Sequence, residues 1–185
     1  MHLHATEQAG GVETSYNEPA FVALGSNLDE PVKQVEKGLV HLDAAADLRV
    51  VACSGLYASD PMGPENQPAY INAVCEIATT LSPLQLLETL LAIESDRGRK
   101  RDTGRWGPRV LDLDLLLFGQ RILRTPRLTV PHPGMLERSF VLLPLLEIAP
   151  GCIVPGKGAA SLYRESVIDN DIKRIGDLSL VSARP

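Results

Sequence analysis

The order of two hydrophobic periodicities between residues 20 and 118 constrains the fold more than any other feature of the sequence. Period-two alternation or a short apolar run predicts a strand, and apolar residues three and four positions apart predict an amphipathic helix. The patterns predict strands at residues 20–24, 48–57, 70–80 and 110–118, a helix from residue 31 and a helix over residues 83–97. The predicted order is therefore strand, helix, strand, strand, helix, strand.

This order is that of ferredoxin-like domains, so we predict the α+β class with a βαββαβ core and a mostly antiparallel sheet. Both helices are expected on one face of the sheet, and the C-terminal additions on the other. In the first helix the apolar positions are Val32, Val35, Leu39 and Leu42. The second begins with Ser82, Pro83 and Gln85, a capping box with proline at the first helical position. Its expected buried residues are Leu84, Leu87, Leu90 and Leu91.

Beyond residue 118 the pattern predicts a hairpin within 121–129, a turn at 130–134, a helix over 138–148 containing Pro144, and a short helix within 162–175. Residues 1–18 show no periodicity, so we expect a flexible tail followed by a single domain over residues 19–185.

Composition and charge limit the class of protein. The net charge is −5 and the pI about 5.4, and neither a membrane-length apolar run nor a signal-peptide pattern is present. Cys53, Cys75 and Cys152 are odd in number and far apart in sequence, which favours reduced, buried thiols. We therefore expect a cytoplasmic protein that binds neither membrane nor bulk nucleic acid.

Two carboxylates share a face of the last predicted strand. Alternation places Leu111, Leu113, Leu115 and Leu117 on one face. It places Asp112 and Asp114 on the other, with Cα atoms roughly 6–7 Å apart. Their repulsion is relieved by a proton, a cation or water, and Mg²⁺ typically takes one or two carboxylates plus substrate phosphates. Taken alone, the pair favours an amphipathic strand whose polar face meets solvent.

The charge around this pair favours an anionic ligand. Residues 97–138 carry ten cations against four acids, a net +6 within an acidic chain. Arginine forks bind phosphate oxygens bidentately, so arginines beside two carboxylates indicate a phosphate-and-metal site, although a solvated basic loop is the alternative. The cations are Arg97, Arg99, Lys100, Arg101, Arg105, Arg109, Arg121, Arg124, Arg127 and Arg138.

The sequence contains neither a P-loop nor a dinucleotide-binding glycine motif, so a nucleotide would have to be held by side chains. His132, fixed between two prolines, could donate to phosphate, or could be a turn histidine that faces water. Tyr70 and Asn72 share a strand face by parity and would suit a planar heterocycle, although Tyr70 as core filler is equally compatible with the pattern.

The segment Arg105-Trp106-Gly107-Pro108-Arg109-x-Leu111-Asp112-Leu113-Asp114 resembles the signature of the hydroxymethyl-dihydropterin pyrophosphokinases of folate biosynthesis. The resemblance covers about residues 21–150. It also includes Ala23-Leu24-Gly25-Ser26-Asn27-Leu28, Pro61-Met62-Gly63-Pro64, Gln67-Pro68-x-Tyr70-x-Asn72-Ala73, Leu128-Thr129-Val130-Pro131-His132-Pro133 and Arg138-Ser139-Phe140-Val141-Leu142.

The resemblance implies transfer of the β,γ-pyrophosphoryl group of the co-substrate ATP to the pterin hydroxymethyl oxygen, giving AMP and the pterin diphosphate. It implies two Mg²⁺ ions held by Asp112 and Asp114, and catalytic roles for these two and for Arg99 and Arg109. The ATP-side positions are Glu94, Arg99, Arg101, Trp106, Arg109, Leu115, Arg127, Thr129, His132 and Arg138. The pterin-side positions are Ser59, Asp60, Met62, Tyr70, Asn72, Asp112 and Phe140. We expect a monomer, and adenine contacts that differ from those of members with a polar residue in place of Leu91.

Two alternatives belong to other functional classes. A ferredoxin-like RNA-binding domain needs exposed aromatic residues on its central strands, whereas the predicted open face here carries Asp112 and Asp114. A non-catalytic ligand-binding domain could use Tyr70 and Asn72 but would not need the arginines with the carboxylate pair.

Overall fold

The computed structural model, which describes residues 18–62, 66–98, 107–168 and 172–178, contains the predicted βαββαβ core. Its elements are β1 (Glu18–Ser26), α1 (Pro31–Ala44), β2 (Leu48–Cys53), β3 (Leu56–Ser59), β4 (Tyr70–Thr79), α2 (Pro83–Asp96) and β5 (Asp112–Phe118). The strands form an antiparallel sheet in the order β10-β3-β4-β1-β5, with β2 also paired to β4. The predicted fold class is confirmed.

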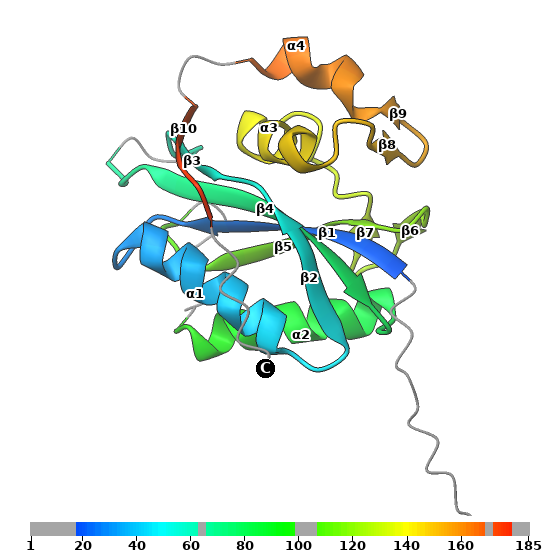
Figure 1. Cartoon of the computed structure of the whole chain (residues 1–185), viewed down its shortest axis with the longest axis horizontal. Coiled ribbons are helices and arrows are strands. Elements are labelled where there is room, and N and C mark those ends of the chain that lie inside the picture. Colours follow the sequence, from blue (N-terminus) through cyan, green and yellow to red (C-terminus); the bar gives the residue numbers. More distant parts are fainter. Residues whose placement is uncertain (1–17, 63–65, 99–106, 169–171, 179–185) are drawn as a thin grey trace, which may run out of the picture.

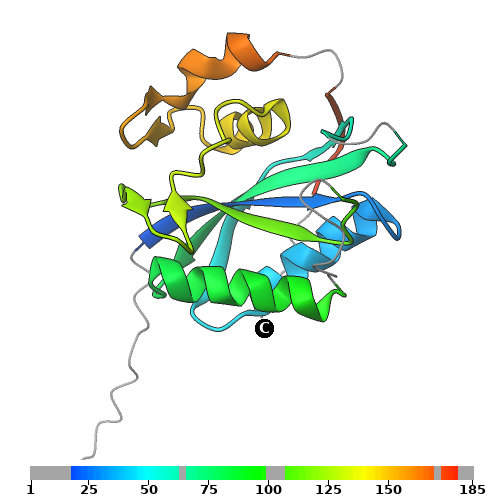
Figure 2. The ribbon, with the colours of Figure 1, turned by 180° about the vertical axis from the view of Figure 1, so that it is seen from behind.

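The chain after β5 builds a second layer. It contains the paired strands β6 (Leu123–Arg124) and β7 (Thr129–Val130), then α3 (Ser139–Ile148), β8 (Ile153–Val154), β9 (Gly158–Ala159), the 3₁₀ helix η1 (Ala160–Tyr163) and α4 (Arg164–Val167). The last strand, β10 (Lys173–Gly176), returns to the main sheet and pairs with β3. Figures 1 and 2 show α1 and α2 on one face of the sheet and α3 with α4 on the other. The sheet is therefore covered on both faces.

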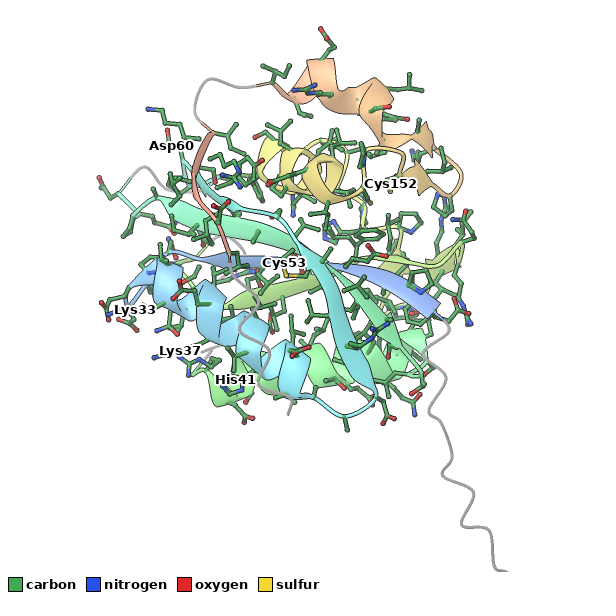
Figure 3. The ribbon with its side chains drawn as sticks, in the orientation of Figure 1. Lys33, Lys37, His41, Cys53, Asp60 and Cys152 are labelled. Carbon is green, nitrogen blue, oxygen red and sulfur yellow. The ribbon has the colours of Figure 1, made fainter. Side chains whose placement is uncertain are left out.

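Each face of the sheet has its own apolar core. Val22, Leu24 and Leu113 pack with Leu39 of α1 and Leu90 of α2. On the opposite face, the second cluster contains Val74, Leu116, Met135, Leu142 and Leu145. The polar side of α1 carries Lys33, Lys37 and His41 at the surface, as Figure 3 shows. Among the described residues, no helix is long and apolar enough to cross a membrane.

The predicted alternation fails near the end of β5. Leu115 pairs with Val22 and Leu117 with Phe21, so Leu116 is an extra residue in a β-bulge. The bulge reverses the phase of the strand. Leu111, Leu113 and Leu115 therefore face α1 and α2 as predicted, whereas Leu117 lies in the α3-side cluster. Asp112 and Asp114 precede the bulge and keep their common face.

Several element boundaries also differ from the predictions. Glu18, predicted as the last residue of the tail, instead begins β1 opposite Thr79, and β1 continues through Gly25 and Ser26. Residues 1–17 lie outside the described residues. The predicted strand over 48–57 is divided at Ser54, whose backbone and side chain bond Val74. The predicted helix within 162–175 ends at Val167, and β10 follows it.

The buried stripe of α2 also differs from expectation. The capping box at Ser82 is confirmed, but Leu86, Leu90 and Ile93 are buried whereas Leu84 is exposed. Leu86 takes the place of Leu84 in the buried stripe, and Leu87 packs against the same core while only partly buried.

The three cysteines are free thiols, as expected, but only Cys75 is buried, whereas Cys53 and Cys152 are partly exposed. Cys53 and Cys75 face each other across β2 and β4 with their sulfurs 2.8 Å apart.

Candidate active site

The strand register places three site residues in one row across the sheet. Gly25 of β1 lies opposite Asn72 of β4 on one side and Asp112 of β5 on the other. A Cβ atom at Gly25 would lie 3.4 Å from Asn72 Oδ1. The absence of a side chain at Gly25 therefore leaves free space between the Asn72 amide and the Asp112 carboxylate, which we call the open floor. Glycine inside a strand often marks close approach of a ligand. This role of Gly25 was not predicted, because the strand was expected to end at residue 24.

A cavity of about 250 Å³ opens above this row. It brings together all seven residues assigned to the pterin side, three of the ten assigned to the ATP side (Arg109, His132 and Arg138) and both carboxylates assigned to the metal. Its lining residues are Gly25, Ser59, Asp60, Met62, Tyr70, Asn72, Gly107, Arg109, Asp112, Asp114, His132, Arg138 and Phe140.

The anionic end of the cavity contains the two carboxylates and an arginine. Arg109 Nη1 donates to Asp112 Oδ2 at 2.6 Å. Burial, followed by the nearby Asp112 carboxylate, raises the pKa of Asp114. Burial opposes the charge of Arg109, but the charge and hydrogen bond of Asp112, together with Tyr70 and Asp114, outweigh burial and raise the pKa of Arg109. A cation bound between the carboxylates would relieve the repulsion that Arg109 only partly offsets.

His132 provides a hydrogen-bond donor beside these carboxylates. Burial lowers the pKa of His132, although Asp114 opposes the shift, so the neutral ring is favoured. Its Nδ1 accepts from the Gly134 backbone N–H at 3.2 Å, which assigns the proton of the neutral ring to Nε2. Its backbone N–H donates to the carbonyl of Leu116 at 2.9 Å. The imidazole ring is therefore held in one orientation, with its Nε2–H as the donor for a ligand.

The other end of the cavity combines aromatic rings with an oriented amide. Asn72 is 5% exposed and its Nδ2 donates to Ser59 Oγ at 3.0 Å and to the Tyr57 carbonyl at 3.4 Å. Its Oδ1 lies beside Gly25. The hydroxyl of Tyr70 donates to the Gly107 carbonyl at 3.1 Å and so ties β4 to the segment before Arg109.

Asn27 is a second residue whose role the sequence did not reveal. It is 1% exposed, and its backbone N–H and Oδ1 bond the carbonyl and N–H of Arg109 at 3.1 and 2.8 Å. Its Nδ2 donates to Gln67 Oε1 and to the Pro68 carbonyl, both at 3.3 Å. One buried amide thus joins the end of β1 to both segments that flank the cavity. The position of Asn27, a polar residue directly after the buried strand β1, was the one feature of the sequence that could have indicated this role.

Four residues assigned to ATP lie away from this cavity. Leu115 packs in the core beneath α1 and α2, and Glu94 is 1% exposed with its Oε1 accepting from the Leu113 N–H at 2.7 Å. Arg127 is exposed and pairs with Glu88 at 2.9 Å. Thr129 lines a neighbouring cavity of about 370 Å³, which His132 also borders. Arg99, Arg101 and Trp106 fall outside the described residues.

The burial of Glu94 predicts a structural effect. Glu94→Ala should lower the free energy of unfolding by about 1–3 kcal/mol, because it removes a carboxylate that accepts from a buried N–H. Urea unfolding followed by circular dichroism measures this change. Glu88→Ala on the same helix removes an exposed ion pair and should cost less than about 1 kcal/mol. Equal losses for the two variants would contradict the structural role.

A family model and individual relatives of this chain point to the same protein family. Residues 21–150 match the family model for 7,8-dihydro-6-hydroxymethylpterin-pyrophosphokinase. A Pseudomonas aeruginosa protein named 2-amino-4-hydroxy-6-hydroxymethyldihydropteridine pyrophosphokinase is 52% identical over 135 residues, which cover 73% of this chain and 83% of that protein. A Haemophilus influenzae protein of the same name is 42% identical over 166 residues, covering 90% of this chain and 98% of that protein.

Solved structures support the fold. The structure of a Plasmodium falciparum HPPK-DHPS matches with a TM-score of 0.66 at 15% identity, covering 85% of this chain and 49% of that chain. Because the identity is low, this likeness concerns the architecture alone. The present chain spans about half the length of that protein.

Proposed function

Because the chain belongs to the 7,8-dihydro-6-hydroxymethylpterin-pyrophosphokinase family, we propose that the cavity above Gly25 is its active site. The enzyme transfers pyrophosphate from ATP to 6-hydroxymethyl-7,8-dihydropterin, giving AMP and the pterin diphosphate in folate biosynthesis. The observation that carries the site proposal is the row of Asn72, Gly25 and Asp112, which sets an amide, an open floor and a carboxylate side by side.

Asp112 and Asp114 would hold two Mg²⁺ ions, which would supply positive charge to the triphosphate of ATP. The donor set fits hard cations, because both carboxylates line the cavity. Burial and the charge of Asp112 raise the pKa of Asp114, and a bound cation would offset both effects and favour the ionised carboxylate. Within the described ranges, no three His, Cys, Asp or Glu side chains form a group that could hold a metal. Phosphate oxygens and water would therefore complete the coordination, as is usual for Mg²⁺. The bound ions would neutralise the charge of the triphosphate during transfer.

Arg109, Arg138 and the Nε2 donor of His132 would hold the phosphates in line with the pterin oxygen. Such transfers depend mainly on positioning the reacting groups and on neutralising their charge. Donors that are already fixed in a buried site stabilise the transition state without having to reorganise during the reaction. Asn27 supports this role because it anchors both backbone groups of Arg109. The contributions of Arg99, Arg101 and Trp106 remain predictions.

Tyr70 and Phe140 would stack on the two faces of the pterin ring, and Asn72 would bond its edge. Both rings and the amide line the same end of the cavity, next to Ser59, Asp60 and Met62. We also propose that the protein acts as a monomer.

The non-catalytic alternatives are not retained. The relatives named above are pyrophosphokinases, which supports the enzyme and not a sensor. The sheet face that a ferredoxin-like RNA-binding domain would leave open is covered here by α3 and the segments that follow it.

One incubation tests the proposed function. The protein, ATP, Mg²⁺ and 6-hydroxymethyl-7,8-dihydropterin should yield AMP and pterin diphosphate in equal amounts, with no ADP. Chromatography separates the four products and substrates. Formation of ADP with a pterin monophosphate, or no pterin-dependent AMP, would refute pyrophosphoryl transfer by this chain.

The open floor at Gly25 predicts a specific loss of affinity. Gly25→Ala should fold normally, since its Cβ would contact Asn72 Oδ1 at an ordinary 3.4 Å, but the methyl group would occupy the cavity. We expect the KM for the pterin to rise about tenfold or more, the usual effect of one methyl-sized change in a ligand pocket. Gly151→Ala, where an added Cβ meets nothing within 4 Å, is the matched control. Normal pterin affinity in Gly25→Ala would show that the floor is not used.

A further inference from the structure

The C-terminal strand β10, which lies outside the family match, contacts a wall of the proposed pterin site. It pairs with β3, placing Arg174 opposite Tyr57 and Lys173 opposite Ala58. On its other edge β3 pairs with β4, where Tyr57 lies opposite Asn72. The short strand β3 therefore lies between β10 and the strand that carries Asn72.

Two atoms of the β3 segment set the orientation of the Asn72 amide. The Tyr57 carbonyl and Ser59 Oγ both accept from Asn72 Nδ2. With Nδ2 directed to β3, Oδ1 is directed to Gly25 and the cavity floor. A shift of β3 would change these contacts and so the direction in which Asn72 presents its carbonyl oxygen.

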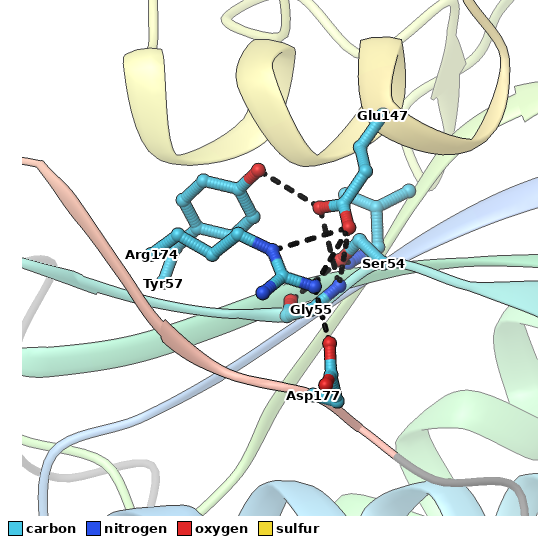
Figure 4. A network of polar contacts seen from close by, with 7 residues as sticks. Ser54, Gly55, Tyr57, Glu147, Arg174 and Asp177 are labelled. Carbon is cyan, nitrogen blue, oxygen red and sulfur yellow. Dashed lines mark hydrogen bonds and ion pairs between the residues drawn. The ribbon is translucent and has the colours of Figure 1, made fainter.

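A carboxylate of α3 fixes the start of the same segment, as Figure 4 shows. Glu147 accepts from the Gly55 N–H with both oxygens at 3.2 Å and from the Tyr57 hydroxyl at 2.8 Å. Burial, with the bond to Glu147, raises the pKa of Tyr57 to about 12, so the hydroxyl remains a donor at neutral pH. Glu147 thereby joins α3, whose first turn carries Phe140, to β3.

Arg174 supplies the positive charge that holds this carboxylate in place. Its Nε and Nη2 donate to Glu147 Oε1 at 3.3 and 3.2 Å, and its guanidinium also contacts Asp177. A Cβ at Gly55 would lie only 2.6 Å from Arg174 Nε, so the guanidinium rests directly on the Gly55 backbone. The side chains of Arg174 and Glu147 are 45% and 30% exposed, so this ion pair adds little to global stability.

We infer that Arg174 is a positioning residue for the pterin: through Glu147 it holds β3 where Tyr57 and Ser59 orient the amide of Asn72. The inference rests on the proposed binding of the pterin by Asn72. It assigns a role in the known reaction to the C-terminal segment. We expect this role to concern the pterin, because in the described part of the chain the hydrogen bonds of Glu147 and Arg174 reach Gly55, Tyr57 and Asp177 and no phosphate-side residue.

Steady-state kinetics with both substrates varied tests the inference in the full chain. Arg174→Gln should raise the KM for the pterin roughly three- to fivefold, the effect expected for a half-exposed ion pair, and leave kcat and the KM for ATP unchanged. Arg174→Lys, which keeps one charged donor near Glu147, should fall between this variant and the wild type. Arg121→Gln removes an ion pair of similar exposure, with Glu18 at 2.8 Å, far from the cavity lining, and should change neither KM.

A double variant separates the inference from the proposal on which it rests. Asn72→Ala should raise the pterin KM, and adding Arg174→Gln should cause no further rise, because both act through one amide. An additive rise, an unchanged pterin KM in Arg174→Gln, or equal rises in both KM values with a lower melting temperature would overturn the inference. A normal pterin KM in Asn72→Ala would instead refute the proposed pterin site. Should Arg174→Gln not fold, Tyr57→Phe, which removes only the 2.8 Å bond to Glu147, is judged by the same criteria.

Discussion

Replacing Asp112 or Asp114 by asparagine is expected to abolish pyrophosphoryl transfer while leaving the protein folded. Each change removes a proposed metal ligand, and we expect turnover to fall by at least about two to three orders of magnitude, as when a key charge-stabilising group is lost. The fold should be retained because the two carboxylates repel one another, and burial together with Asp112 raises the pKa of Asp114. AMP formation measures turnover, and thermal unfolding measures stability.

Glu36→Asn is the control for these two variants. Glu36 lies exposed on α1, across the sheet from the cavity, and its replacement removes one negative charge without touching the site. It should leave turnover unchanged. Full activity of Asp112→Asn or Asp114→Asn at ordinary Mg²⁺ concentrations would remove the metal role from these residues.

Arg109→Ala should lower kcat/KM about 100- to 1,000-fold, the range observed when one preorganised charge-stabilising donor is removed. The guanidinium lines the cavity beside both carboxylates, and Asn27 fixes its backbone. Arg109→Lys should recover only part of the loss, because lysine keeps the charge but not the planar fork. Initial rates with ATP and pterin varied separately measure the effect.

Arg121→Ala tests whether the effect of Arg109 is specific. Arg121 belongs to the same basic segment but is exposed, pairs with Glu18, and lines neither the cavity above Gly25 nor its neighbour. Its loss reduces the overall positive charge equally and should change kcat/KM little. Similar losses in the two variants would indicate general electrostatic attraction of ATP in place of a fixed contact.

The core of the fold could be predicted because its elements are locally encoded. The capping box at Ser82 and the leucine alternation that leads into β5 depend on residues close in sequence; the first is found, and the second holds as far as Leu115. The errors lie where the structure depends on pairing between strands that are distant in sequence. The bulge at Leu116 follows from the register against β1, and β10 exists because β3 offers an unpaired edge. Neither pairing leaves a periodic signal in its own segment.

The candidate site was predictable where chemistry depends on unusual side chains. The carboxylate pair, Arg109, His132 and the pterin-side residues converge on one cavity, although they come from distant parts of the chain. Gly25 and Asn27 were missed because their roles arise from what lies across the sheet and across the loops. The inward rotation of Glu94 could not be foreseen either, since a helix-end acid is normally exposed.

The most direct test of the account counts the divalent ions in the assembled site. Mn²⁺ can replace Mg²⁺ and is detected by electron paramagnetic resonance when the protein is mixed with a non-hydrolysable ATP analogue and the pterin. We predict two bound Mn²⁺ ions per wild-type chain and a loss of bound Mn²⁺ in the double variant Asp112→Asn, Asp114→Asn. Two tightly bound ions in that double variant, or none in the wild-type complex, would contradict the proposal that these carboxylates hold the metal for pyrophosphoryl transfer.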